Sequence, residues 1–66
     1  MGCVGTVDVR VPGGDAPGEV ELVLDGIVET WLAYAPHEVP VGSRVLVIHE
    51  RGGRALDVVP WDIGQE

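Results

Sequence analysis

Residues 44–59 read Arg-Val-Leu-Val-Ile-His-Glu-Arg-Gly-Gly-Arg-Ala-Leu-Asp-Val-Val, and this stretch decides the fold. Two runs rich in valine and leucine stand on either side of Gly52-Gly53, a residue pair typical of a hairpin turn. Within each run, apolar residues recur with the period of two that a β-strand produces. The stretch therefore predicts an antiparallel hairpin with strands over residues 44–50 and 54–59.

The same alternation continues toward the N-terminus and predicts three further strands, over residues 4–11, 19–24 and 27–35. A stretch rich in proline and glycine separates the first two, and Asp25-Gly26 is a second short hairpin signal. No segment has convincing helical periodicity. The 66 residues are expected to form one domain, residues 1–66. Five short strands in so small a domain predict an all-β, five-stranded barrel of the OB type, because closure removes exposed strand edges.

The alternation also predicts which side chains fill the barrel. Each strand has one face that is apolar and another that carries polar or charged residues. The expected core consists of Val7, Val9, Val20, Leu22, Val45, Val47, Leu56 and Val58.

The loop at Asp25-Gly26 determines how residues 27–35 pair with residues 19–24. A two-residue turn pairs Leu22 with Glu29 and puts a carboxylate beside the apolar face. A three-residue loop pairs Leu22 with Val28 and Val20 with Thr30. We prefer this loop because it keeps the Glu29 carboxylate away from the apolar face. It turns Trp31 away from the apolar face, unless a bulge within the third strand brings it back.

Charge and hydropathy exclude several classes of partner. The formal net charge is −7, with 11 acidic residues, four arginines and no lysine. Such a surface repels nucleic-acid phosphates and anionic lipid headgroups. The longest aliphatic run, residues 45–48, is far too short to span a membrane, and no signal peptide precedes the first strand. We therefore expect neither nucleic-acid binding nor direct membrane insertion by this segment.

The residues that could carry catalysis or bind a metal do not form a recognisable pattern. Cys3, His37 and His49 lack the spacing of metal ligands, and Cys3 lies near the chain start with no recognisable oxyanion loop to support a cysteine nucleophile. Glu19 and Glu21 share one strand face, but a barrel this small has no cleft between paired carboxylates. We expect no enzyme active site, no metal and no cofactor.

The N-terminal residues 1–6, Met-Gly-Cys-Val-Gly-Thr, fit the loose template for N-myristoylation. The first predicted strand begins almost at once, however, and leaves no flexible tether. We do not expect lipidation.

The last two strands are apolar on both faces. If Val45 and Val47 fill the barrel, then Leu46, Ile48, Val59 and Trp61 point outward and lie side by side across the hairpin. One explanation is that a loop or the C-terminal tail covers them. The other is an interaction surface, because contiguous exposed apolar patches mark binding sites. These four residues are the candidate protein-interaction residues.

Several motifs resemble the soluble C-terminal domain of NfeD-like proteins. They are Pro40-Val-Gly-Ser-Arg-Val-Leu-Val47, Leu56-Asp-Val-Val-Pro60 and Val4-Gly-Thr-Val7, with Gly26 and Ala33 between them. The interval from Gly26 to Ala33 is a few residues longer than the family pattern. The resemblance implies a five-stranded OB barrel in a protein with transmembrane helices. It also implies partners among flotillin- and stomatin-like membrane proteins.

The function expected from the sequence is a non-enzymatic protein-interaction domain of an NfeD-like, membrane-associated protein. Its partner would be a flotillin- or stomatin-like protein or a second copy, on the cytoplasmic side of the membrane. The alternative is a nucleic-acid or oligosaccharide-binding OB module, and the charge argues against its nucleic-acid form. A small hydrolase is a third and weaker reading.

Overall fold

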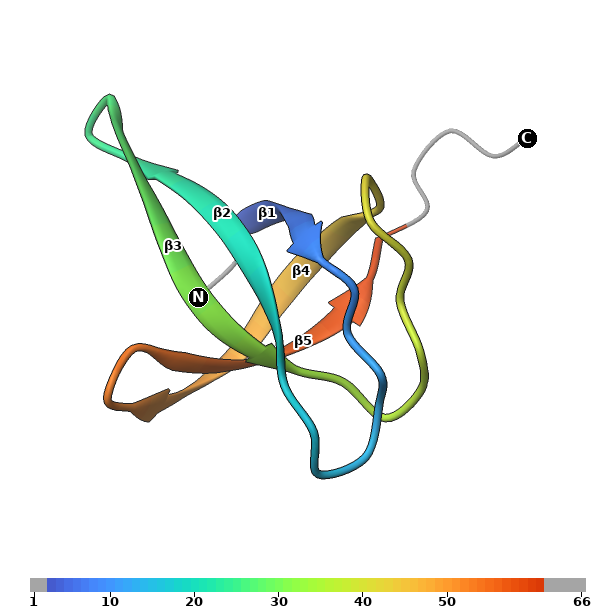
Figure 1. Ribbon diagram of the computed structural model, residues 1–66. Helices are drawn as coiled ribbons and strands as arrows, with labels where there is room; N and C mark the ends of the chain where they lie inside the picture. The colour runs from blue at the N-terminus through green and yellow to red at the C-terminus, as the bar shows by residue number, and fades with distance from the viewer. Residues whose placement is uncertain (1–2, 62–66) are drawn as a thin grey trace.

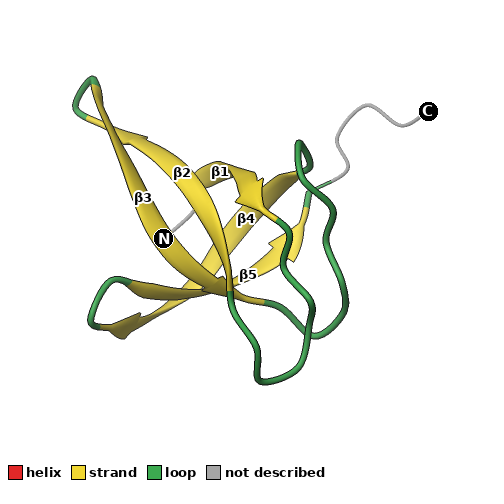
Figure 2. Ribbon diagram, viewed as in Figure 1, coloured by secondary structure: helices red, strands yellow, loops and turns green. Residues whose placement is uncertain are grey.

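The computed structural model describes residues 3–61 and contains five strands (Figure 1). The strands are β1 (Val4–Val9), β2 (Gly18–Leu24), β3 (Ile27–Tyr34), β4 (Arg44–Gly52) and β5 (Ala55–Pro60). Across this described part of the chain, the elements are strands, turns and loops, with no helix (Figure 2). Accordingly, residues 3–61 include no helix of the length and apolarity needed to cross a membrane. The predicted strands are confirmed, with ends displaced by at most two residues.

The five strands close into a barrel in the order β1-β2-β3-β5-β4, with β1 pairing back onto β4. All neighbouring pairs are antiparallel except β3 and β5, which run parallel. A five-stranded barrel with this crossed order is the OB-type architecture that the sequence predicts. The expected fold class is therefore confirmed.

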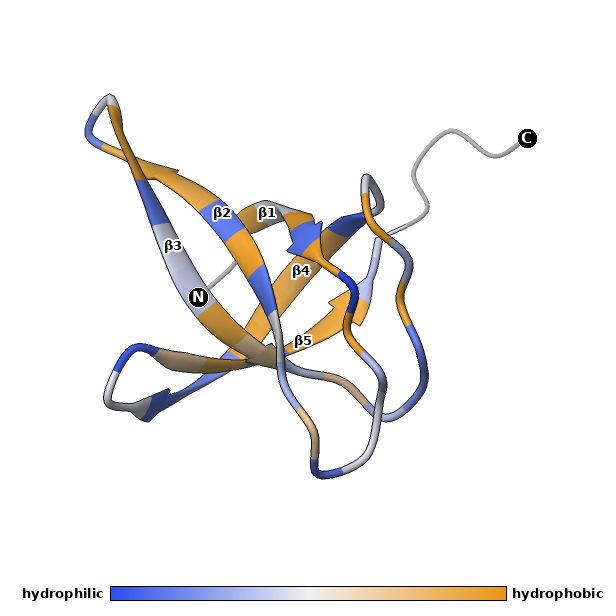
Figure 3. Cartoon of the chain, in the orientation of Figure 1, coloured by the Kyte–Doolittle hydropathy of each residue, from blue (hydrophilic) through white to orange (hydrophobic). Residues whose placement is uncertain are grey.

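The core of the barrel is small and consists mostly of valine. Apolar and polar residues alternate along β2 (Figure 3), so one face of this strand is apolar and turns toward the core. The buried apolar residues are Val7, Val11, Val20, Leu22, Ala33, Ala35, Val39, Val45, Val47, Leu56 and Val58. Seven of the eight predicted core residues are in this set. Within residues 3–61, no polar or charged residue is buried.

Two of the buried valines lie outside the strands. Val11 and Val39 belong to the loops that follow β1 and β3, and each donates its backbone N–H to the carbonyl of the other, at 3.0 and 2.8 Å. This isolated bridge closes one end of the barrel with two side chains that are almost wholly buried. The loops thus contribute to the core as the strands do.

Val9 was expected in the core, and this prediction is wrong. The pairing of β1 with β2 shifts between Val7 and Val9, so Val7 lies opposite Val20 but Val9 lies opposite Glu19. Such a bulge inserts one residue into a strand and reverses the facing of those beyond it. Val9 therefore points outward and is 48% exposed.

The preferred register of β2 and β3 is also wrong. Leu22 lies opposite Glu29, and Leu24 lies opposite Ile27, so Asp25-Gly26 is a two-residue turn. Asp25 and Gly26 have φ angles of 53° and 77°, as a type I′ turn requires. Val20 then faces Trp31 directly, without a bulge in β3.

The carboxylate that argued against this register has partners. Glu29 accepts a hydrogen bond from the indole Nε1 of Trp31 at 3.3 Å, and its Oε1 lies 3.6 Å from Nη2 of Arg54. The Arg54 guanidinium in turn lies over the indole ring of Trp31, with its Cζ atom 4.8 Å from the ring centroid. Arg54 comes from the β4–β5 turn, and barrel closure places it beside Glu29.

β1 and β2 also approach one another closely at Gly18. A Cβ atom at this position would lie 2.4 Å from the carbonyl oxygen of Arg10 and 2.5 Å from that of Val9. Both contacts are with backbone, which cannot move aside as a side chain can. Gly18 is therefore required for the chain to cross here.

Replacing Val47 by alanine should lower the free energy of unfolding by about 1–3 kcal/mol, because it leaves a cavity in a closely packed core. Val41 is the matched control, since it is 62% exposed whereas Val47 is 3% exposed. The Val41→Ala change should be less than about 0.5 kcal/mol. Urea unfolding measures both values, and equal losses for the two variants would contradict the assignment of Val47 to the core.

Candidate functional site

The outer face of β4 and β5 holds the four residues singled out in the sequence. Leu46 lies directly opposite Val59, so both side chains are on the same face of the sheet, and both are half-buried. Ile48 is the extra residue of a bulge between Val47 and His49, and it is 53% exposed. Two of these side chains thus pack together, and the third extends into solvent beside them.

Trp61 continues this face beyond the end of β5. Its backbone N–H donates to the carbonyl oxygen of Arg44 at 3.0 Å, which extends the pairing of β4 with the chain after Pro60. Trp61 is half-buried. Because Val59 and Trp61 are two residues apart in an extended segment, their side chains lie on the same side of the chain.

The sequence analysis missed Val4, which adds to the same face. Val4 pairs with Leu46 across β1 and β4 and is half-buried. Leu46 is therefore flanked by an apolar residue on each side, which explains its partial burial. Only closure of the barrel brings β1 beside β4, so no local sequence signal could have placed Val4 here. We call Val4, Leu46, Ile48, Val59 and Trp61 the β4–β5 face.

A shallow depression of about 340 Å³ adjoins the β4–β5 face at Ile48 and His49. On its other side, the Arg51 guanidinium lies over the Tyr34 ring, 3.9 Å from the centroid. The Arg51 Nε donates to Oδ1 of Asp57 at 2.9 Å, and the Nη2 lies 2.8 Å from the same oxygen. The hydrogen bond to Asp57 raises the pKa of Arg51 above its ordinary value. The positive charge in the depression is therefore permanent and already paired.

The residues considered for catalysis or metal binding do not converge. In the described part of the chain, no three histidine, cysteine, aspartate or glutamate side chains are grouped so that they could hold a metal ion. Cys3, His37 and His49 are exposed. Glu19 and Glu21 share the outer face of β2, whereas Glu29 lies opposite the inward-facing Leu22. Met1 and Gly2 of the myristoylation template lie outside the described residues.

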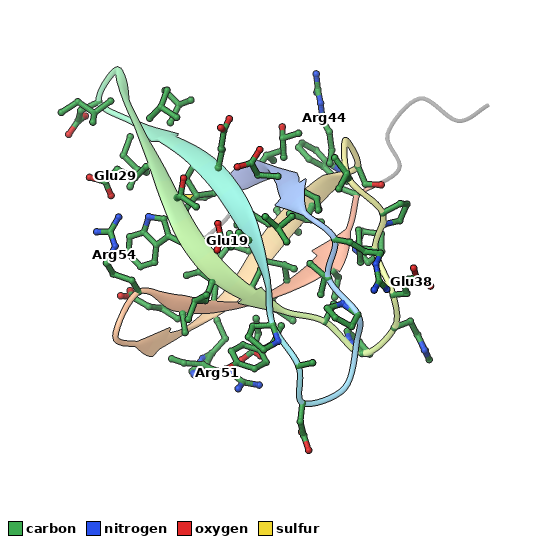
Figure 4. All side chains as sticks on the ribbon, viewed as in Figure 1. Glu19, Glu29, Glu38, Arg44, Arg51 and Arg54 are labelled. Atoms are coloured by element: carbon green, nitrogen blue, oxygen red, sulfur yellow. The ribbon has the colours of Figure 1, made fainter. Side chains whose placement is uncertain are left out.

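Three of the four arginines already have carboxylate partners. Arg10 pairs with Glu38 at 3.1 Å, and the Arg51–Asp57 and Arg54–Glu29 pairs are described above. Figure 4 shows Arg54 and Glu29 turned toward one another, with Arg44 well apart from both. Among residues 3–61, Arg44 is the arginine without an ion pair. The arginines therefore form no continuous basic groove of the kind that nucleic-acid binding needs.

Comparisons with known proteins agree on one family. The profile of the NfeD C-terminal domain family matches residues 4–59. Among solved structures, the chain is similar to the soluble domain of the NfeD protein YuaF from Bacillus subtilis, with 28% sequence identity and a TM-score of 0.74. That alignment covers 88% of this chain and 69% of the YuaF chain. No curated protein sequence matches the chain.

The protein should not bind single-stranded nucleic acid at physiological salt with a Kd below about 100 μM, because cationic contacts supply most of the non-specific affinity. The net charge of −7 opposes binding, and the ion pairs occupy most of its few cations. Fluorescence anisotropy with a labelled oligothymidylate measures this. Micromolar binding that weakens as salt is added would contradict it.

Proposed function

The chain belongs to the NfeD C-terminal domain family, and from that membership we propose that it is a protein-interaction domain without enzymatic activity. We place its docking surface on the β4–β5 face. The observation that carries the proposal is the exposure of Ile48 beside the half-buried Leu46, Val59 and Trp61. A contiguous apolar surface of this kind is typical of a protein-binding site.

The chemistry of the face supports a protein partner. Trp61 and Ile48 are large apolar side chains, and tryptophan is the residue type most enriched among binding hot spots. The neighbouring Arg51 and Asp57 neutralise one another, and Asp15 also lines the adjoining depression, which therefore offers a polar rim. Apolar centres with polar rims are typical of protein interfaces.

The absence of enzymatic activity is supported by the dispersion of the titratable side chains. Catalysis by side chains needs a nucleophile, base or acid held within reach of one another. In the part of the chain that the structure describes, the exposed Cys3 and the two histidines belong to different elements. The ion-paired carboxylates are bound to arginines, which reduces their availability as bases.

The partner we propose is a flotillin- or stomatin-like protein, on the cytoplasmic side of a membrane. This part of the proposal rests on family membership. The YuaF domain was solved as the soluble domain of an NfeD protein, and the present chain has the same barrel. A domain that does not itself enter the bilayer can meet a membrane-associated partner at the bilayer surface.

Ile48→Asp should weaken binding to the flotillin- or stomatin-like protein of the same organism by at least about tenfold, because it places a charge in an apolar contact. Trp61→Ala should weaken it as well, through lost contact area. Val41→Asp is the matched control, since Val41 is similarly exposed but lies in the loop before β4.

Co-purification of the partner with the intact protein, followed by titration calorimetry, measures these effects. Binding by the Ile48→Asp and Trp61→Ala variants as tight as that of the Val41→Asp control would rule out the β4–β5 face as the docking surface. Interaction with a second copy instead would appear as dimerisation that Ile48→Asp abolishes, and would contradict the choice of partner.

A further inference from the structure

A second surface, on different strands, has a chemistry that the β4–β5 face lacks. The outer sides of β1, β2 and β3 meet in cross-strand rows. Val9, Glu19 and Leu32 form one row, and Val23 and Val28 form another. Between them lies a row of Thr6, Glu21 and Thr30. We call these eight residues the acidic sheet face.

The apolar residues of the acidic sheet face are unusually exposed. Val9 is 48%, Leu32 40%, Val23 65% and Val28 59% exposed. An antiparallel sheet with one face in solvent normally carries polar residues on that face. These four side chains contribute little to the core. Stability of the barrel therefore does not explain why apolar residues stand on this outer face.

Two carboxylates stand at the centre of this face. Glu19 and Glu21 are two residues apart on β2, so both point outward. Glu19 lies within the row of Val9 and Leu32, and Glu21 lies between the two apolar rows. Glu19 is half-buried between Val9 and Leu32. Among residues 3–61 neither glutamate forms an ion pair. Three arginines bind Glu29, Glu38 and Asp57, and the fourth, Arg44, lies opposite Thr6 at the edge of this face.

This charge determines the chemistry of the occupant. A second copy docked face to face would bring two glutamates of each copy together, with only Arg44 at the edge of the face to offset them, in a protein whose net charge is already −7. Anionic lipid headgroups and nucleic-acid phosphates are repelled in the same way. The fitting occupant carries positive charge and also has apolar groups to cover the valines.

We propose that the acidic sheet face binds a segment of another protein in which lysine or arginine stands between apolar side chains. The two apolar rows are separated by four residues along β3, from Val28 to Leu32, or about 13 Å at the rise of a β-strand. The occupant's basic residue meets Glu19 and Glu21, and its apolar residues reach the rows on either side. This site is independent of the β4–β5 face and of the partner proposed for it.

A random 12-residue peptide library, displayed on phage and selected against the protein, tests the proposal without a known partner. The enriched peptides should contain lysine or arginine flanked by apolar residues. Their affinity for the protein should fall as salt is raised from low to high concentration, because the central contact is ionic. Amide chemical-shift changes on peptide binding should be largest in β2 and β3.

The variant Glu19→Gln/Glu21→Gln should weaken binding of these peptides by about tenfold. Asp15→Asn/Glu50→Gln is the charge-matched control, because it raises the net charge by the same two units at exposed positions off this face that form no ion pair within residues 3–61. All four substitutions are isosteric, and thermal unfolding checks that both variants remain folded. A second test, Val28→Ser, should weaken binding through lost apolar contact while leaving the salt dependence in place.

Several results would overturn the proposal. One is a selection that enriches no peptides, or enriches peptides without basic residues. Another is a loss of affinity that is equal in the Glu19→Gln/Glu21→Gln variant and its control. Chemical-shift changes confined to β4 and β5 would assign the peptides to the β4–β5 face instead. Self-association abolished by Val28→Ser, or binding to anionic vesicles through this face, would contradict the choice of occupant.

Discussion

The short parallel pairing of β3 with β5 is the constraint on which the rest of the structure depends. It consists of Leu32 with Ala55, Ala33 with Leu56, and Tyr34 with Asp57. These pairs join the β2–β3 hairpin to the β4–β5 hairpin and close the barrel. They bury Ala33 and Leu56 in the core and bring Arg54 within reach of Glu29. Beyond them the β2–β3 hairpin extends away from the barrel, as Figure 1 shows.

Local patterns in the sequence were enough to predict most of the fold. The alternation around Val45, Val47, Leu56 and Val58 shows which side chains point inward, because strand geometry sends every second residue to the same face. Turn glycines mark where strands end. Val11 and Val39 were not predicted in the core, because they lie in loops and meet only when the barrel closes.

Both errors come from features that the alternation of residues along a strand does not show. The register at Leu22 was rejected because it placed Glu29 on an apolar face, and the compensating Arg54 is distant in sequence. Val9 was assigned to the core because a bulge gives no signal in a strand that otherwise alternates. The sequence predicted the outward facing of four residues of the β4–β5 face but not the acidic sheet face, because Val9 faces outward only through the bulge and Val28 only through the two-residue turn.

The hydrogen bond from Nη2 of Arg54 to the carbonyl oxygen of Thr30, at 3.3 Å, lies on an exposed edge of the sheet. β3 pairs with β5 only from Leu32 onward, so the edge over Ile27–Trp31 lacks a strand partner within the described residues. A free edge with exposed Ile27 and Val28 is a template for pairing with another chain, the first step toward aggregation. Arg54 occupies a backbone acceptor on that edge and places a charge beside it. A charge beside a free strand edge is one of the means by which proteins disfavour pairing with another chain, and Arg54 supplies it to the β2–β3 hairpin from a different hairpin.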